Sequence, residues 1–140
     1  MSGVKIKVKV VVDTNVIVSA LININGTPAK ILSLIINGSI RVLYDNRIIY
    51  EYIEVLSRKE FGFPREAVND MIDAIKRDGE FINAEYLGIK FSDEADKKFY
   101  EVYKFGDAQY LITGKIKHFP AEETIIIPED FLHVYEKQKK

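Results

Sequence analysis

Hydrophobic and polar positions alternate at the start of the chain and then give way to a continuous apolar run. Apolar residues alternate with lysines over positions 4–10, and positions 10–12 are three consecutive valines. This change of pattern predicts a strand that enters a buried sheet. Asp13 follows directly, and ligands of open parallel sheets bind beyond the carboxyl ends of the strands. We interpret Asp13 either as a ligand of a metal ion or as the cap of a helix that Thr14 and Asn15 begin.

Helical and extended patterns alternate along the rest of the chain. The periodicity predicts helices over 16–22 and 28–36, through 48–56, from 64 to about 79, from 93 or 96 to about 103, and from 128 onward. Short strands are predicted near 40–43, 81–82, 110–113 and 124–127. Strands separated by helices predict an α/β fold, with a parallel sheet covered by helices on both faces.

Length and composition narrow the class of protein. The chain has 140 residues, of which 47% are apolar, so we expect one folded domain over residues 1–140. The absence of cysteine fits a reducing cytoplasm and excludes thiolate metal sites. The first residues lack the pattern of a signal peptide and no apolar stretch has the length of a membrane span, so we expect a cytoplasmic protein without a membrane partner. With a net charge of −1, nucleic acid would have to be bound through a local patch or through metal ions.

Several acidic residues are candidates to join Asp13. Glu51 lies in the helix predicted through 48–56, and Asp93 and Asp96 lie three residues apart at the start of a later helix. Converging carboxylates with no lysine or arginine among them repel one another unless a cation binds. Oxygen ligands suit Mg²⁺ or Mn²⁺, which can activate water and neutralise a phosphodiester. The structural alternatives are a helix cap for Asp93 and a solvated helix face for Glu51.

Four segments together resemble a known family. They are VDTNVIVSAL at 12–21, EYIEVLSR at 51–58, DEADKKFYEV at 93–102, and LITG at 111–114 followed by KHFP at 117–120. The combination resembles the PIN domain, and within it the VapC-type toxins of toxin–antitoxin systems.

The resemblance implies a three-layer α/β/α sandwich and a Mg²⁺- or Mn²⁺-dependent ribonuclease. Its catalytic metal ligands would be Asp13, Glu51, Asp96 and Asp93. Asn15 and Thr113 would be polar helpers near the metal or the substrate, and Glu101 is a lesser candidate. It also implies a homodimer and a separate protein antitoxin.

The chain departs from the family pattern at Lys115. Many PIN domains carry an aspartate directly after the Thr-Gly of the fourth segment, where a charged lysine cannot bind a metal. Lys115 would then contact a phosphate or point to solvent. With Lys117, His118 and Arg47 it would form a basic rim, in which His118 contacts RNA rather than acting as a general base. The alternative is an ordinary mixed surface. Among the many aromatic residues, one or two exposed rings are expected to stack on unpaired bases.

Three functions follow from these patterns. The first is a metal-dependent endoribonuclease that cleaves single-stranded RNA, restrained as a toxin by an antitoxin. The second is a weakly catalytic or inactive RNA-binding or assembly module, in which Lys115 marks the loss of activity. The third, a phosphatase with an aspartyl nucleophile, is disfavoured because no second aspartate stands two residues after Asp13.

Overall fold

Five parallel strands form the central sheet. The computed structural model describes residues 7–138, so the alternating positions Val4 and Ile6 lie outside the described residues. The strands lie in the order β3-β2-β1-β4-β5, with neighbouring strands parallel. Their bounds are Val8–Val12 for β1, Ile40–Tyr44 for β2, Glu80–Phe81 for β3, Tyr110–Ile112 for β4 and Ile125–Ile126 for β5. The predicted α/β class with a parallel sheet is confirmed.

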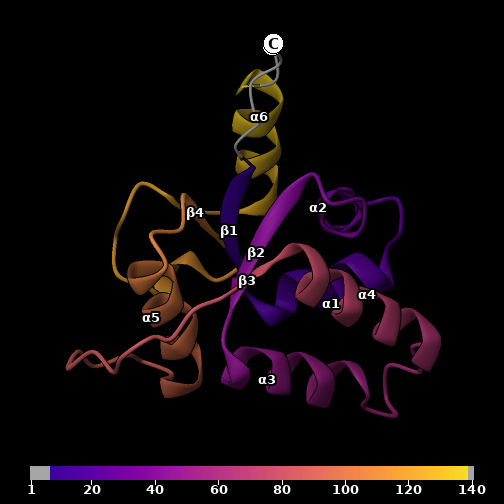
Figure 1. Cartoon of the computed structure of the whole chain (residues 1–140), viewed down its shortest axis with the longest axis horizontal. Helices are drawn as coiled ribbons and strands as arrows, with labels where there is room; N and C mark the ends of the chain where they lie inside the picture. Colours follow the sequence, from indigo (N-terminus) through magenta and orange to yellow (C-terminus); the bar gives the residue numbers. More distant parts are fainter. Residues whose placement is uncertain (1–6, 139–140) are drawn as a thin grey trace.

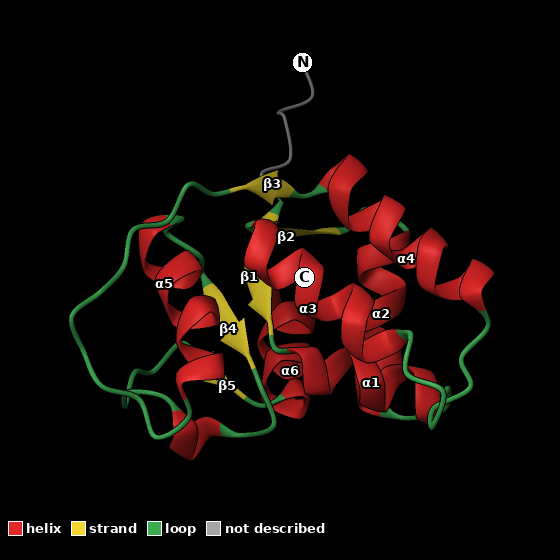
Figure 2. Cartoon of the chain, turned by 90° about the horizontal axis from the view of Figure 1, so that it is seen from below, coloured by secondary structure: helices red, strands yellow, loops and turns green. Residues whose placement is uncertain are grey.

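Within residues 7–138, six α-helices surround this sheet. They are Thr14–Ile22 (α1), Thr27–Ile36 (α2), Asn46–Leu56 (α3), Arg65–Asp78 (α4), Lys97–Phe105 (α5) and Pro128–Gln138 (α6). Helix α5 packs on one face against β1, β2 and β4, whereas α2, α4 and α6 pack on the other. Figure 2 shows α5 on one side of the strands and the cluster of α1, α2 and α4 on the opposite side. The fold is therefore the expected three-layer α/β/α sandwich, with α3 near the carboxyl ends of the central strands (Figure 1).

The local signals in the sequence begin and end several elements as predicted. Pro28 lies in the first turn of α2, and Gly38 follows that helix with φ +77°, which glycine adopts without strain. The Asp45 carboxylate accepts a hydrogen bond from the Ile48 amide and caps α3. Asp93 likewise caps a short 3₁₀ helix, Glu94–Asp96, which leads into α5. The last two predicted strands are shorter than expected, because β4 ends before Thr113 and β5 has only two residues.

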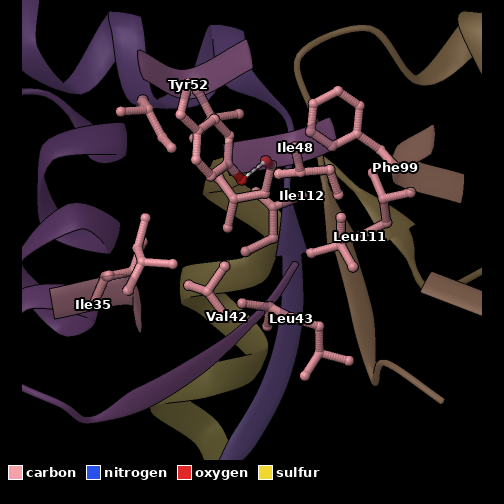
Figure 3. Packing of buried hydrophobic residues seen from close by; sticks show 14 of the residues in the cluster. Ile35, Val42, Leu43, Ile48, Tyr52, Phe99, Leu111 and Ile112 are labelled. Carbon is pink, nitrogen blue, oxygen red and sulfur yellow. Dashed lines mark hydrogen bonds between the residues drawn. The ribbon is translucent and has the colours of Figure 1, made fainter. Parts of the chain in front are cut away.

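Buried side chains from both helical layers meet the sheet close to the end of β1. Tyr52 of α3 and Phe99 of α5 are completely buried, and Figure 3 shows both rings above Ile112 and Ile48. The Tyr52 hydroxyl donates a hydrogen bond to the backbone carbonyl of Val12, drawn as a dashed line in Figure 3. This bond fixes α3 relative to the residue that precedes Asp13.

Among residues 7–138, no single helix is long and apolar enough to cross a membrane. Helices α1 and α2 meet those criteria only when counted together, across a bend of 105°.

Candidate functional site

The pairing of β1 with β4 places Asp13 beside Thr113. Val12 is opposite Ile112 in the parallel register, so the next residue of each strand leaves the sheet at the same edge. The Thr113 hydroxyl donates a hydrogen bond of 2.8 Å to Asp13 Oδ2 and accepts one of 2.9 Å from the Lys115 amide. Thr113 therefore orients Asp13, as a polar helper would.

Asp13 does not cap α1 with its side chain. It precedes the helix, but its carboxylate makes no capping hydrogen bond, and only 2% of the residue is exposed. Across residues 7–138, Thr113 is the only hydrogen-bond donor to this carboxylate. Burial raises the pKa of Asp13, and the charges of Asp96 and Glu51 raise it further, against the opposing effects of Thr113 and Lys115. Asp13 is thus a buried carboxylate with an unused oxygen, which is the property expected of a metal ligand.

Asp96 lies close enough to Asp13 for their charges to interact, and two basic side chains cover it. Lys115 Nζ is 3.1 Å from Asp96 Oδ1, and His118 Nδ1 is 3.1 Å from Asp96 Oδ2. Burial lowers the pKa of Lys115, but the charge of Asp13 and the contact with Asp96 outweigh it, so the pKa is raised. Lys115 is therefore a firmly charged lysine inside the acidic site, not one that points to solvent.

Glu51 reaches the same edge of the sheet from α3. The Thr14 hydroxyl, next to Asp13, donates a hydrogen bond to Glu51 Oε2. Lys98 Nζ of α5 lies 2.6 Å from Glu51 Oε1. Glu51 is therefore held between α1 and α5 rather than on a solvated helix face.

Two further candidates have different surroundings. Asp93 is exposed, and its carboxylate caps the 3₁₀ helix through the Ala95 amide, so it lies outside the buried group. It affects the site through its charge on Lys115. Asn15 presents a buried side-chain oxygen, Oδ1, that has no hydrogen-bond partner within the described part of the chain. An orphaned amide oxygen next to Asp13 has the chemistry of a ligand for a metal ion or its water.

Arg47 and Glu101 form a separate structural cluster with Asp45. Arg47 contacts Asp45 Oδ2 at 2.7 Å and Glu101 Oε1 at 2.7 Å, so it does not join the predicted basic rim. The other oxygen of Glu101 accepts a hydrogen bond of 2.7 Å from the Leu87 amide. Glu101 is 1% exposed and fully engaged, which makes it a structural residue rather than a ligand.

The arrangement also corrects the expectation that no basic residue lies among the acids. Lys115 and Lys98 each pair with one of them, and no group of three His, Asp or Glu side chains within residues 7–138 is arranged to hold a metal ion. The donor chemistry nevertheless fits a hard divalent ion, because the unused oxygens of Asp13 and Asn15 are those that Mg²⁺ or Mn²⁺ prefers. Asp96 would supply a further oxygen only in place of its contact with Lys115.

Lys98 also belongs to this site, although no sequence pattern pointed to it. It lies within the segment 93–102, but nothing in that segment sets it apart, and only the packing of α5 against α3 shows that it reaches Glu51. Tyr86, in the loop between β3 and the 3₁₀ helix, was also missed. Its ring is 86% exposed and lies beneath the Arg47 guanidinium, 5.6 Å from the ring centre.

Comparisons with known proteins agree with this fold. The profile of the PIN domain matches residues 9–117, which include all four segments except the end of the last. An uncharacterized protein of Methanocaldococcus jannaschii, MJ1680, is 49% identical over 59 residues, which are 42% of this chain and 32% of that protein. This chain thus matches about a third of the relative's length. PIN domains are generally nucleases that use divalent metal ions. Because the profile covers most of the chain, the protein belongs to the PIN domain family.

Proposed function

We propose that this protein is a Mg²⁺- or Mn²⁺-dependent endoribonuclease that hydrolyses phosphodiester bonds of single-stranded RNA. The observation that carries the proposal is the buried Asp13 carboxylate, held by Thr113 and left with an unused oxygen at the edge of the sheet. Asp96 and Glu51 are near enough for their charges to act on Asp13. Family membership supports the nuclease class, and the oxygen donors support the choice of metal.

Each residue has a defined part in this proposal. Asp13, Asp96 and Glu51 would hold the metal, with Asp93 as an outer acid, and Thr113 and Thr14 orient two of these carboxylates. When bound, the metal would activate water and neutralise charge on the phosphodiester. Lys115 and His118, which are one-third or more exposed, would turn from Asp96 toward a phosphate of the RNA. Asn15 would bind the metal, its water or the substrate through its orphaned oxygen.

The contact between Lys115 and Asp96 also favours a second candidate function. A tethered ammonium group at 3.1 Å already neutralises one of the acids without any metal. If metal ions cannot displace it, the protein is a weakly catalytic or inactive PIN-like module that binds RNA or serves in assembly. Metal binding therefore separates the two candidates.

The decisive experiment measures cleavage of a mixed single-stranded RNA pool with Mn²⁺, with EDTA, and by the Asp13→Asn variant. The matched control is Asp107→Asn, which removes the same charge from an exposed turn where φ is +52°, a conformation that asparagine tolerates. Cleavage that needs both Mn²⁺ and Asp13, and survives in the control, supports the nuclease. No cleavage together with no calorimetric Mn²⁺ binding supports the inactive module. A variant Asp13→Asn that cleaves as fast as the parent shows that the site assignment is wrong.

The partners and the location of the protein remain predictions. We propose a protein antitoxin and a homodimer on the basis of the toxin-like motifs, and a cytoplasmic location on the basis of the sequence. Co-purification from the native cell, followed by determination of mass in solution, tests the antitoxin and the dimer together.

A further inference from the structure

A groove between α3 and α5 adjoins the candidate site. It has a volume of about 800 Å³, within the range of about 300–1,000 Å³ of ligand sites. Its walls include Tyr50 and Glu51 of α3, Lys97 and Lys98 of α5, and Tyr86 of the intervening loop. Figure 1 shows α3 and α5 near the same end of the molecule, with that loop passing beside α5. Glu51 and Lys98 belong to both the groove and the site, so the two are contiguous.

Two tyrosine rings face solvent in this groove. Tyr50 is 77% exposed and Tyr86 is 86% exposed, which makes them the most exposed aromatic side chains within residues 7–138. Exposure of a large ring has a hydrophobic cost and is typical of binding surfaces. Arg47 lies against Tyr86, and Glu101 binds the backbone amide of Leu87, the next residue. The cluster of Asp45, Arg47 and Glu101 thus contacts Tyr86 and holds the residue that follows it.

The charges around the groove balance one another. Glu51 pairs with Lys98, and Glu101 pairs with Arg47. The two remaining carboxylates of the lining, Glu54 and Glu94, lie 2.9 Å from Arg58 and 4.0 Å from Lys97. A lining of this kind does not favour a phosphate group. It suits a neutral, planar group whose faces stack on the tyrosines and whose edges bond with the carboxylates and with Asn46.

We propose that this groove binds an unpaired nucleobase of the RNA segment next to the scissile phosphate, with Tyr50 and Tyr86 as stacking residues. The proposal rests on the proposed ribonuclease function and deepens it, because it explains how a protein with a net charge of −1 holds a single strand. Aromatic stacking is available only to bases that are out of a duplex. The groove therefore restricts the substrate to single-stranded RNA with little preference for sequence.

The test measures binding of a short single-stranded RNA in EDTA, by fluorescence anisotropy, so that cleavage does not interfere. The variants are Tyr50→Leu, Tyr86→Leu and the double variant, with Tyr50→Phe and Tyr86→Phe to restore stacking. Phe105→Leu is the matched control, because Phe105 is 41% exposed but lines a different cavity. We expect each leucine variant to weaken binding by about 5- to 150-fold, the range that one stacked base contributes. The phenylalanine variants and the control should bind as the parent does.

An RNA that carries one abasic nucleotide, moved along the strand, shows whether a base is the group recognised. When the abasic nucleotide stands at the position that stacks in the groove, this RNA should bind the parent protein as weakly as the intact RNA binds the double variant. The double variant should then bind the abasic RNA no more weakly than it binds the intact RNA. Equal losses in parent and double variant at every position overturn the proposal. So does a tyrosine-dependent affinity for a short oligoarginine peptide without affinity for RNA, which would assign the groove to a basic protein partner.

The result also separates this inference from the proposed function. Cleavage that depends on Mn²⁺ and Asp13, with a KM that the leucine variants leave unchanged, overturns the nucleobase site alone. The opposite result is RNA binding in which the tyrosines and one base depend on each other, without any metal-dependent cleavage. It overturns the proposed nuclease activity and supports the nucleobase site.

Discussion

Two groups of buried carboxylates lie at the carboxyl ends of β1 and β2, and they differ in how completely their oxygens are used. In the group after β2, Asp45 and Glu101 share Arg47, and the backbone amides of Ile48 and Leu87 take the remaining oxygens. In the group after β1, Asp13 receives a single hydrogen bond within the described residues.

The partners also differ in how easily they can leave. Asp96 is covered by Lys115 and His118, whose side chains are 33% and 43% exposed and can swing into solvent. Glu101 is held in part by a backbone amide, which cannot move without the chain. Burial of a carboxylate is therefore by itself a poor guide to function. A better guide is a carboxylate oxygen without a hydrogen-bond partner, or one whose partner can move away.

The largest expected difference between the groups is in activity. Asp13→Asn should lower RNA cleavage by more than about a hundredfold, because even residues that only orient metal ligands contribute about 10- to 100-fold. Asp45→Asn should keep cleavage at saturating RNA, although it weakens the ion pair with Arg47. Initial rates on the same RNA, with equal amounts of folded protein, measure both. Equal losses of cleavage in the two variants would show that the two groups of carboxylates do not differ in their importance for activity.

The next largest difference is in stability. Arg47→Met leaves Asp45 and Glu101 without their shared cation and should lower the free energy of unfolding by about 2–3 kcal/mol, the lower side of the usual cost because Arg47 is partly exposed. Lys115→Met, the same kind of change in the group after β1, should cost about 1 kcal/mol or less. The two cations are equally exposed, but Lys115 makes one contact of 3.1 Å, with an acid that His118 also contacts, whereas Arg47 holds two carboxylates. Urea unfolding monitored by circular dichroism compares them. A larger loss of stability for Lys115→Met would show that the group after β1 is the structural one.

The expected change in metal affinity is smaller than these changes in activity and stability. Lys115→Asp removes a cation that competes for Asp96 and adds a carboxylate, so it should tighten Mn²⁺ binding about tenfold, or about 1.4 kcal/mol. Lys117→Asp makes the same change of charge on an exposed neighbour and should have little effect. Titration calorimetry measures both. Weaker binding by Lys115→Asp would show that Lys115 is not near the metal.

The smallest expected effect is on the pH dependence of stability without metal. The pKa of Asp13 is raised in the folded protein above the value of about 3.9 for an exposed aspartate. The folded state therefore binds this proton more strongly than the unfolded state, and the stabilisation is lost as pH rises through the raised pKa. Asp13→Asn should be more stable than the parent at neutral pH in EDTA, and the difference should shrink as the pH falls toward 4. Thermal unfolding at several pH values tests this, and a constant difference would show that Asp13 is not the group responsible.

Much of the fold was predictable because its signals are local. The run of valines before Asp13, Pro28 in the first turn of α2 and the Asp45 cap of α3 each act within a few residues. The shortening of β4 and β5 was not predictable, because the residues left out, Thr113, Thr124 and Ile127, are all β-branched and continue the strand-like pattern. In the candidate site, the sequence indicated the acids and Lys115, but it indicated neither Lys98 nor the pairing of the two lysines with Glu51 and Asp96.

The sequence by itself determined the α/β class and the position of Asp13 at the end of a buried strand, since hydrophobic periodicity and the alternation of strands with helices are local properties of the chain. Only the tertiary structure decided which partner each acid has. Arg47 and Glu101 are 54 positions apart, and Lys98 meets Glu51 across two different helices. Long basic side chains reach several acids at similar energies, so the choice among them depends on how α3, α5 and the ends of the strands pack together.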